Sequence, residues 1–319
     1  ALSEKYGLNI DPDMVIEDIT VGMQQRVEIL KMLYRDADIL IFDEPTAVLT
    51  PQEIDDLMEI MRNLVSEGKS VILITHKLNE IKAVADRCTI IRRGKFIGVV
   101  DVKTTSVSKM ASMMVGRPVN FKVEKKLAQV GRVILDLHDL NVMSNKKVLG
   151  VKDFSLSVKA GEIVGIAGVD GNGQTELVEA ITGLRPVESG TITLDGNDIT
   201  HADIRRRNEI GIGHIPEDRQ KRGLVMASSL FNNVAIKEYY HSPFSKHGIL
   251  DADYLREYAQ KVTEQFDVRS GEGIFSLAGK LSGGNQQKLI VGREVVADPE
   301  LLIAVQPTRG LDVGAIEYI

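Results

Sequence analysis

The feature that most constrains this chain is a repeat between its two ends. The loop LSGGNQQK at 281–288, with a hydroxyl, two glycines and a polar trio, precedes the hydrophobic run LLIAV at 301–305. A diverged copy of the loop, TVGMQQR at 20–26, precedes the run ILIF at 39–42. Matching positions in the two copies are a constant 262 residues apart. We therefore interpret the chain as a duplication whose copies have diverged in their chemistry.

Length and composition are compatible with two globular domains. A chain of 319 residues corresponds to about two domains of roughly 150 residues each. Two complete copies at an offset of 262 residues would not fit into a chain of this length. We therefore expect that both copies are incomplete and that the chain is a fragment lacking both ends. Hydrophobic residues at 43% and charged residues at 26% are typical of a globular chain. The sequence contains no run of eighteen apolar residues that could span a bilayer, and its opening lacks the layout of a signal peptide.

Charge and cysteine content exclude some classes of function. A formal net charge of −6 argues against a general nucleic-acid binder, which normally carries a basic excess. The one cysteine, Cys88, cannot form an intramolecular disulfide, and it lies in a strand-like segment typical of a small core residue. Zinc-ligand spacing is absent from the sequence.

The first copy has the pattern of a parallel α/β unit. Apolar spacing predicts an amphipathic helix over 21–34, followed by a buried strand over 39–42. A second helix is predicted from Pro51 and ends at Gly68, and a second buried strand covers 70–75. The order strand, helix, strand indicates a parallel sheet, and ligands bind beyond the carboxyl ends of such strands.

Three polar residues are predicted to lie at those carboxyl ends. Asp43 and Glu44 follow the first strand, and His76 follows the second. Asp43 is suited to hold Mg²⁺, which takes one or two carboxylates together with phosphate oxygens. Glu44 would orient and polarise an attacking water, and His76 would donate to a γ-phosphate. The alternative is an ordinary exit from a strand with a satisfied loop histidine, and the loop at 20–26 makes this the weaker interpretation.

A phosphate-binding loop is predicted near the middle of the chain. A buried strand predicted over 163–167 enters GVDGNGQT at 168–175, which matches G-x-x-x-x-G-K-[ST] except that Gln174 replaces the lysine. Its glycines let backbone N–H groups close around phosphates at a helix N-terminus. The alternative is a glycine-rich turn between a strand and a helix. The candidate nucleotide-binding residues here are Gly168, Gly171, Asn172, Gly173, Gln174 and Thr175, and Thr175 also offers a hydroxyl to Mg²⁺.

The missing lysine weakens the predicted chemistry of this loop. A unit charge pair at about 4 Å is worth roughly 4 kcal/mol at an effective dielectric near 20, whereas a neutral amide offers only hydrogen bonds. We therefore expect the loop with Gln174 to retain binding and to lose turnover.

The remaining segments are less specific. TIIRRGKFIGVV at 89–100 predicts an antiparallel pair with its turn at Arg93 and Gly94, and the residues after it predict a short helix and a linker. A second amphipathic helix is predicted over 251–267. The charged loop GIGHIPEDRQKRG at 211–223 is open to two interpretations, a solvated surface or a functional loop.

Together these motifs resemble those of the ATP-binding subunits of ABC transporters. LSGGNQQK resembles the family signature, 168–175 its Walker A loop, 39–44 its Walker B strand with the catalytic glutamate, and His76 its switch histidine. The two fused copies, the sequence PTRGLD at 307–312 and the sequence PEDR at 216–219 make the chain similar to importers of monosaccharides. GVDGNGQ and VGMQQR are closer still to a nucleoside-import branch of that class.

The resemblance implies a fold, cofactors and partners. The fold is an α/β P-loop NTPase with two tandem ABC nucleotide-binding domains, both truncated, each with a mixed sheet and a helical subdomain. Residues 1–100 would be the end of the first domain, 101–129 a linker, and 130–319 a second domain without its C-terminal end. The implied cofactors are ATP and Mg²⁺. The implied partners are membrane permease subunits and, indirectly, an extracellular solute-binding protein, with no nucleic acid. The implied location is peripheral, on the cytoplasmic face of the cell membrane.

The resemblance also implies two composite ATP sites, each formed by the phosphate loop of one domain and the signature of the other. Site one would pair a first phosphate loop outside this chain, together with Asp43, Glu44 and His76, with the intact signature at Ser282, Gly283, Gly284 and Gln286. Site two would pair the loop at 168–175 with the diverged signature at Thr20, Val21 and Gly22, and it would include Glu217, Val305 and Gln306. Site two has lost the lysine, the carboxylates and a signature glycine, so we predict that site one hydrolyses ATP and site two mainly binds it.

Some residues depart from the family pattern. Glu217 stands where the Q-loop glutamine is expected, and Thr50 stands where the first D-loop aspartate is expected, whereas Leu311 and Asp312 resemble the second D-loop. The stretch before Gly161 contains no tyrosine to stack on adenine.

Two other functions remain open at this point. A duplicated ABC ATPase acting on ribosomes or DNA would more often carry a long charged helical linker, and only about thirty residues separate the halves here. A nucleotide-binding regulator without hydrolysis is disfavoured by Glu44 and His76.

Overall fold

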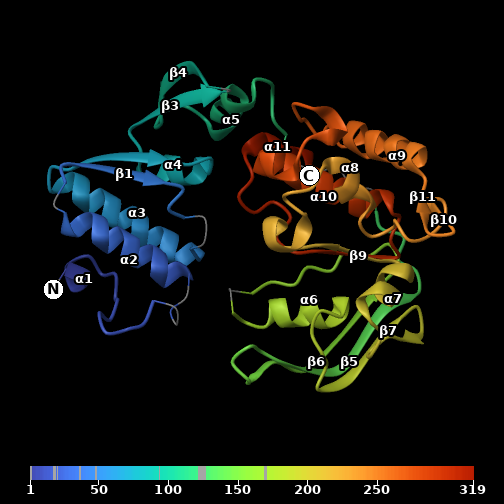
Figure 1. Ribbon diagram of the computed structural model, residues 1–319. Helices are drawn as coiled ribbons and strands as arrows, with labels where there is room; N and C mark the ends of the chain where they lie inside the picture. Colours follow the sequence, from blue (N-terminus) through green and yellow to red (C-terminus); the bar gives the residue numbers. More distant parts are fainter. Residues whose placement is uncertain are drawn as a thin grey trace. The chain divides into compact units, whose positions relative to one another are not determined.

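The computed structural model describes residues 2–16, 19, 21–35, 37–46, 49–92, 94–120, 127–168 and 171–319 (Figure 1). The chain forms two compact units, one made of residues 1–122 with 312–318 and the other of residues 123–311 with residue 319. Within the described ranges, no helix is long and apolar enough to cross a membrane. Each unit is described separately below.

A short parallel sheet and two long helices form the centre of the first unit. Strands β1 (Ile39–Asp43) and β2 (Ser70–Ile74) pair in parallel, as the sequence predicts. Helices α2 (Val21–Tyr34) and α3 (Pro51–Ser66) lie beside each other on one side of β1 (Figure 1). Short helices α1 (Leu2–Lys5) and α4 (Leu78–Val84) complete this part of the unit. The core between α2, α3 and β1 is made of Leu8, Ile29, Leu40, Phe42, Leu57, Met58, Ile60, Met61 and Leu64.

The prediction that the run at 39–42 is buried is wrong for half of its side chains. Leu40 and Phe42 are 2% and 4% exposed, whereas Ile39 and Ile41 are 61% and 58% exposed. Successive side chains of a strand point to opposite faces, and α2 and α3 cover only the face that carries Leu40 and Phe42. The run of apolar residues therefore predicts the strand correctly, but it predicts burial correctly for only one face of the strand.

The rest of the first unit is a hairpin packed with two short helices. Strands β3 (Arg87–Arg92) and β4 (Lys95–Asp101) form the predicted antiparallel pair, and the turn residue Arg93 lies outside the described residues. Helix α5 (Val107–Val115) confirms the short helix predicted after this pair. Helix α11 (Val313–Tyr318) belongs to this unit although it follows the second unit in the chain. Its Val313 lies in a core cluster with Leu78, Ile81, Val102, Met110 and Ala111.

An antiparallel sheet and a helix form one half of the second unit. The sheet has the order β6-β5-β7-β8, with β5 at Val133–Met143, β6 at Leu149–Lys159, β7 at Ser189–Leu194 and β8 at Asn197–Asp198. Helix α6 (Gln174–Thr182) lies over β5 and β6 (Figure 1). Its Leu177, Ala180 and Ile181 pack into the core on this sheet.

Helices and a second short parallel sheet form the other half. Strands β9 (Ile212–Ile215) and β12 (Leu301–Ala304) pair in parallel, and α7 (Ile204–Glu209) precedes β9. The helices of this half pack around Leu230, Val234, Ala259, Val262, Leu289 and Ile290. They are α8 (Leu230–Ala235), α9 (Ala252–Gln265), α10 (Gly283–Val296), the π-helix η1 (Arg219–Gly223) and the 3₁₀ turns η2 (Gly273–Phe275) and η3 (Ala278–Lys280). The small hairpin of β10 (Ser245–Lys246) and β11 (Ile249–Leu250) joins α8 to α9.

The strand predicted over 163–167 is not formed. The structure describes all five residues, and none of them is in a strand. Ile163 is 86% exposed, so the apolar run is not buried either. A strand needs a partner for its backbone N–H and C=O groups, and β9 and β12 pair only with each other. An apolar run predicts a tendency to form a strand, but the partner strand decides whether one forms.

Candidate functional site

Glu44 and His76 meet at the carboxyl ends of β1 and β2. The parallel register places Asp43 opposite Ile74, so the residues that follow both strands lie at one edge. The His76 Nδ1 atom is 2.8 Å from the Glu44 Oε1 atom, which also accepts the His76 backbone N–H at 3.2 Å. The other carboxylate oxygen of Glu44, Oε2, is buried and has no hydrogen-bond partner among the described residues. A buried oxygen without a partner is costly, so this atom is placed to accept a hydrogen bond from a bound group.

A buried polar cluster holds the loops that carry these two residues. Thr46 donates its hydroxyl to Glu80 at 2.5 Å, and Thr75 donates to the other oxygen of Glu80 at 3.1 Å. Lys77 Nζ donates to the Thr46 carbonyl oxygen at 2.9 Å. Glu80, in the first turn of α4, therefore ties the loop after β1 to the loop after β2. Glu80 was not predicted from the sequence, although an acidic residue in the first turn of a helix that follows His76 is a signal for such a role.

The repeat is visible in the backbone as well as in the sequence. The bounds of α10 are those of α2 shifted by the offset of 262 residues. Glu44 has a φ of 46° and Gln306, its counterpart, has a φ of 44°. This left-handed conformation is uncommon for residues other than glycine and recurs at functional sites. The two positions therefore have the same backbone conformation and different side chains.

The counterpart edge in the second unit contains a different polar group. Gln306 Nε2 donates to the Glu217 Oε1 atom at 3.1 Å, and the guanidinium of Arg309 also bonds that oxygen. Glu217 is therefore already engaged by an amide and a cation. The structure brings together Gln306 and Glu217, two of the residues predicted for site two, and adds Arg309, which the sequence analysis did not identify.

Two glycines of the loop before α6 have a left-handed backbone conformation. Gly171 and Gly173 have φ angles of 87° and 96°. A Cβ atom at Gly173 would lie 2.2 Å from the Gly150 carbonyl oxygen, so only glycine fits there. Gln174 begins α6, and Thr175 is exposed in its first turn. The free N–H groups at such a helix start favour an anion. Residues 169 and 170 of the predicted loop lie outside the described residues.

The side chain that replaces the lysine folds back across the loop. A Cβ atom at Gly168 would lie 1.9 Å from the Gln174 Nε2 atom, so the Gln174 amide fills the space that the missing side chain leaves. The loop therefore presents a neutral amide close to its own backbone where the motif would have an extended cation.

The signature loop opens α10 as predicted. Ser282 is the N-cap of the helix, and its hydroxyl accepts the Asn285 backbone N–H at 3.5 Å. Gly283 and Gly284 form the first positions of the helix. In the diverged first copy, Thr20 and the side chain of Val21 lie outside the described residues. The intact copy therefore has the predicted helix-opening geometry.

The side chain of Gln286, a predicted nucleotide contact, packs inside the second unit. Gln286 is 2% exposed, and its Nε2 atom donates to the carbonyl oxygens of Ala278 at 3.1 Å and Leu281 at 3.3 Å. It shares the buried face of α10 with Leu289 and Ile290, three and four residues on. Gln286 therefore holds the turn before the signature in place through its Nε2 atom, and its buried Oε1 atom has no hydrogen-bond partner among the described residues.

Thr50, a departure from the family pattern, performs the same local task as its counterpart Asp312. The Thr50 hydroxyl accepts the Glu53 backbone N–H at 3.3 Å at the start of α3. Asp312 accepts the Ala315 backbone N–H at 2.9 Å at the start of α11. Both residues therefore act as caps three residues before the N–H group that they satisfy.

A buried charge cluster lies behind β9. The carboxylate of Glu294 accepts the His214 backbone N–H at 3.0 Å and the Lys237 ammonium at 2.6 Å. Burial, with Lys237 and other cations adding to it, lowers the pKa of His214 to about 4. The His214 ring is therefore neutral near pH 7, and the cluster fixes β9 to α10.

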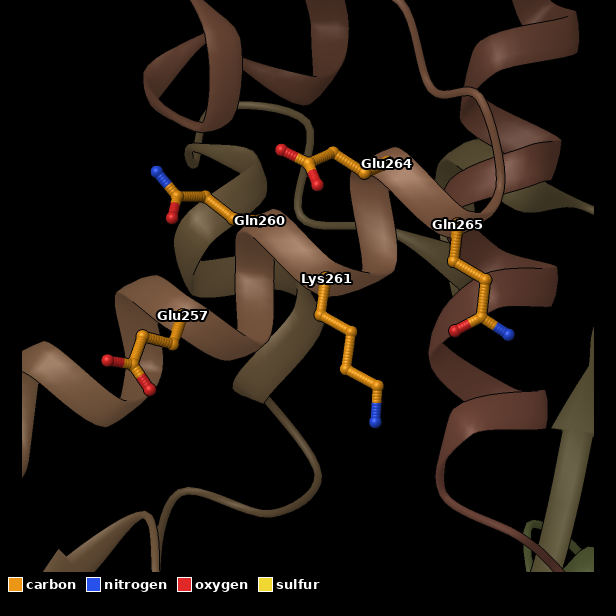
Figure 2. Close-up of a pocket in the computed structure, with 5 residues that line it drawn as sticks. All are labelled: Glu257, Gln260, Lys261, Glu264 and Gln265. Atoms are coloured by element: carbon orange, nitrogen blue, oxygen red, sulfur yellow. The ribbon is translucent and has the colours of Figure 1, made fainter.

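Other surface features do not add a site. A hollow of about 550 Å³ is lined by Glu257, Gln260, Lys261, Glu264 and Gln265 (Figure 2). All five side chains come from α9 and point in different directions, so they do not converge on one point (Figure 2). Across the part of the chain that the structure describes, no group of three or more His, Cys, Asp or Glu side chains is gathered to hold a metal ion.

The chain belongs to the ABC transporter family, whose model matches residues 1–47 and 151–309. It has the α/β P-loop NTPase fold of that family. It is 58% identical over 318 residues to the nucleoside import ATP-binding protein NupA of Lactococcus lactis subsp. cremoris, covering 100% of this chain and 63% of that protein. It is 56% identical over 318 residues to the guanosine import ATP-binding protein NupO of Bacillus subtilis, covering 100% of this chain and 62% of that protein.

The chain therefore spans about three fifths of the length of these curated relatives. Among solved structures, it resembles the archaeal ribosome recycling factor aABCE1, determined in complex with the ribosomal stalk protein aP1. The TM-score is 0.63 at 17% identity, over 99% of this chain and 58% of that one. At this level of identity the likeness shows the fold alone.

Proposed function

We propose that this chain is part of a subunit with two tandem nucleotide-binding domains, which binds and hydrolyses ATP to drive the import of a nucleoside or a monosaccharide through a membrane permease. The relatives named above are import ATP-binding proteins, which supports this class of function. The subunit would lie on the cytoplasmic face of the membrane and would receive its solute indirectly from an extracellular binding protein.

The observation that carries the proposal is the contrast between the two equivalent edges. At the first edge, Glu44 is a carboxylate paired with His76 at 2.8 Å, and one of its oxygens lacks a hydrogen-bond partner among the described residues. At the second edge, Gln306 is an amide that is already bonded to Glu217. A general base for water must be ionisable and must have an oxygen available, and only Glu44 meets both requirements. We therefore assign hydrolysis to the site that contains Glu44 and binding to the site that contains Gln306.

The residues present fit a nucleotide and its metal ion. The start of α6 after its N-cap Gly173 would offer backbone N–H groups to phosphate oxygens, and Gly168, Gly171 and Asn172 belong to the same loop. Asp43 and Thr175 are both exposed and offer the hard oxygen ligands that Mg²⁺ prefers, so they would hold this ion in sites one and two. Bound Mg²⁺ would neutralise charge on the phosphates.

Each side chain of site one then has a defined task. Glu44 accepts a hydrogen bond from the attacking water and holds it in line with the terminal phosphate. His76 fixes the orientation of the Glu44 carboxylate and would donate to the γ-phosphate. Ser282, Gly283 and Gly284 at the start of α10 would offer their hydroxyl and N–H groups to a nucleotide phosphate.

Two assays on the complete protein test this function. Membranes that contain its permease should retain the protein during purification, and the protein should release phosphate from ATP. Retention on ribosomes or DNA instead of the permease would contradict the transport function. Binding of ATP without phosphate release would indicate a regulator. The 319 residues alone should turn over ATP slowly, since the proposed site one takes its phosphate loop from outside them.

A further inference from the structure

The charged segment Glu217–Arg222 contacts three other elements of the second unit. Glu217 bonds Gln306 and Arg309 in the loop after β12. Arg222, at the other end of the segment, pairs with Glu179 of α6, the helix that follows the phosphate loop. These contacts exclude the interpretation of the segment as simply a solvated surface.

Arg219 makes the third connection, to the start of α10. Its Nη1 atom donates to the Arg309 carbonyl oxygen at 2.9 Å. A Cβ atom at Gly283 would lie 2.9 Å from the Arg219 Nη2 atom, and the three atoms nearest to that position all belong to Arg219. A Cβ atom at Gly310 would lie 3.5 Å from the same nitrogen. The guanidinium therefore lies between the first residue of α10 and the loop after β12.

The surroundings of Arg219 are energetically unfavourable for a residue with only a packing role. Its Nε atom is buried and has no hydrogen-bond partner among the described residues. A cation beside the start of a helix also faces the positive end of the helix dipole. An aliphatic side chain would fill the same space without either cost.

We propose that Arg219 is a positioning residue that couples the start of α10 to the loop at 306–310. The guanidinium is in contact with Gly283 and holds the Arg309 carbonyl oxygen, so a shift of either segment displaces the other. Glu217 strengthens the coupling, because it binds the side chain of Arg309 while Arg219 binds its backbone. The coupling itself follows from these contacts. Its consequence for ATP, that the signature and the loop after β12 move together when nucleotide binds, rests on the proposed function.

Hydrogen exchange without nucleotide tests the coupling in a way that does not depend on ATP hydrolysis. Gly283→Ala places a methyl group against Arg219 and should raise exchange at the distant amides of 306–311 by about fivefold or more, because it pushes the guanidinium off the Arg309 carbonyl oxygen. Arg219→Ala should raise the same exchange directly. Because both changes break one connection, the double variant should exchange no faster than Arg219→Ala alone.

The controls separate this coupling from local damage. Gly271→Ala adds a methyl group where nothing lies within 4 Å, and Arg256→Ala removes an exposed arginine that pairs with Asp253 on its own helix. Neither should change exchange at 306–311. If Gly283→Ala changes exchange only around residue 283, or if the two effects add in the double variant, the proposal is wrong. If Gly283→Ala fails to fold, unchanged exchange at 306–311 in Arg219→Ala is sufficient to overturn it.

Discussion

At positions 44 and 306 the same unusual backbone conformation carries two different side chains. Both residues have a left-handed φ, of 46° and 44°. Glu44 directly follows strand β1, and Gln306 lies two residues after the end of strand β12. Glu44 keeps an ionisable oxygen without a partner among the described residues, whereas Gln306 is bonded to Glu217. The same backbone conformation therefore occurs at both positions, and only Glu44 is a carboxylate. A difference in a single side-chain group separates the two sites more clearly than any difference in fold.

The phosphate loop of the second unit should bind ATP more tightly when its lysine is restored. Gln174→Lys adds a charge near the β- and γ-phosphates, and we expect the Kd for ATP with magnesium to fall by about tenfold or more, since solvent reduces the full Coulomb energy. Isothermal titration calorimetry measures this directly. Gln174→Met is the matched control, because it has a similar length and no charge. Equal affinities of the lysine and methionine variants would contradict the account of this loop.

His214 should make the second unit less stable in mild acid. Its pKa in the folded protein is about 4, below its usual value of 6.5, because the ring is buried next to Lys237. Between these two values the unfolded chain binds a proton that the folded chain does not. The contribution of His214 to the free energy of unfolding is therefore complete above about pH 6.5. It is lost as the pH falls towards 4, and the loss is on the order of 3 kcal/mol at most.

Urea unfolding at several pH values measures this loss. His214→Gln should remove this part of the pH dependence, whereas the exposed His138→Gln should leave it unchanged. If the free energy of unfolding changed with pH by the same slope in the wild type and in His214→Gln between pH 4 and pH 6.5, the ring would be protonated in the folded state.

At the scale of elements, periodicity predicted helices better than it predicted burial. The predicted helix over 21–34 is formed with those bounds, and the predicted antiparallel pair over 89–100 is formed as β3 and β4. The strand predicted over 163–167 is absent, although all five of its residues are described. A helix satisfies its own backbone groups, whereas a strand depends on a neighbour elsewhere in the chain. The sequence could therefore specify the first kind of element locally and the second only in part.

The candidate site divides in the same way. The proximity of Glu44 and His76 could be predicted, because each lies within two residues of the end of a strand of one parallel pair and the edge that they share follows from that order. The pairing of Glu217 with Arg309 could not, since 92 residues separate them and only the folded unit brings them together. The burial of Gln286 could not be predicted, because its position in the motif does not reveal which face of α10 it occupies.

The cap of α3 should contribute measurably to the stability of the first unit. Thr50 forms a capping box with Glu53, and its backbone N–H donates to the Glu53 carboxylate at 2.9 Å. Thr50→Ala removes the hydroxyl that satisfies the Glu53 N–H, so we expect a loss of about 1 kcal/mol in the free energy of unfolding. Urea unfolding followed by circular dichroism measures it. Thr50→Ser, which keeps the hydroxyl, should lose much less, and equal losses in both variants would exclude a capping role.

At the scale of the whole molecule, the two units have different roles in the proposed function. The chain returns to the first unit at its end, where α11 places Val313 in the core beside α5 and pairs Glu317 with Arg117 at 2.7 Å. The first unit contains the proposed base, Glu44, and the second contains the intact signature at 281–284.

The central claim, that the site with Glu44 hydrolyses ATP and the site with Gln306 mainly binds it, is tested most directly by comparing two substitutions in the complete protein. Steady-state phosphate release should fall by about a hundredfold or more in Glu44→Gln, which keeps the shape and removes the base. It should remain within about threefold of wild type in Gln306→Ala, since that side chain has no part in the chemistry. Equal losses in the two variants would contradict the asymmetry of the two sites.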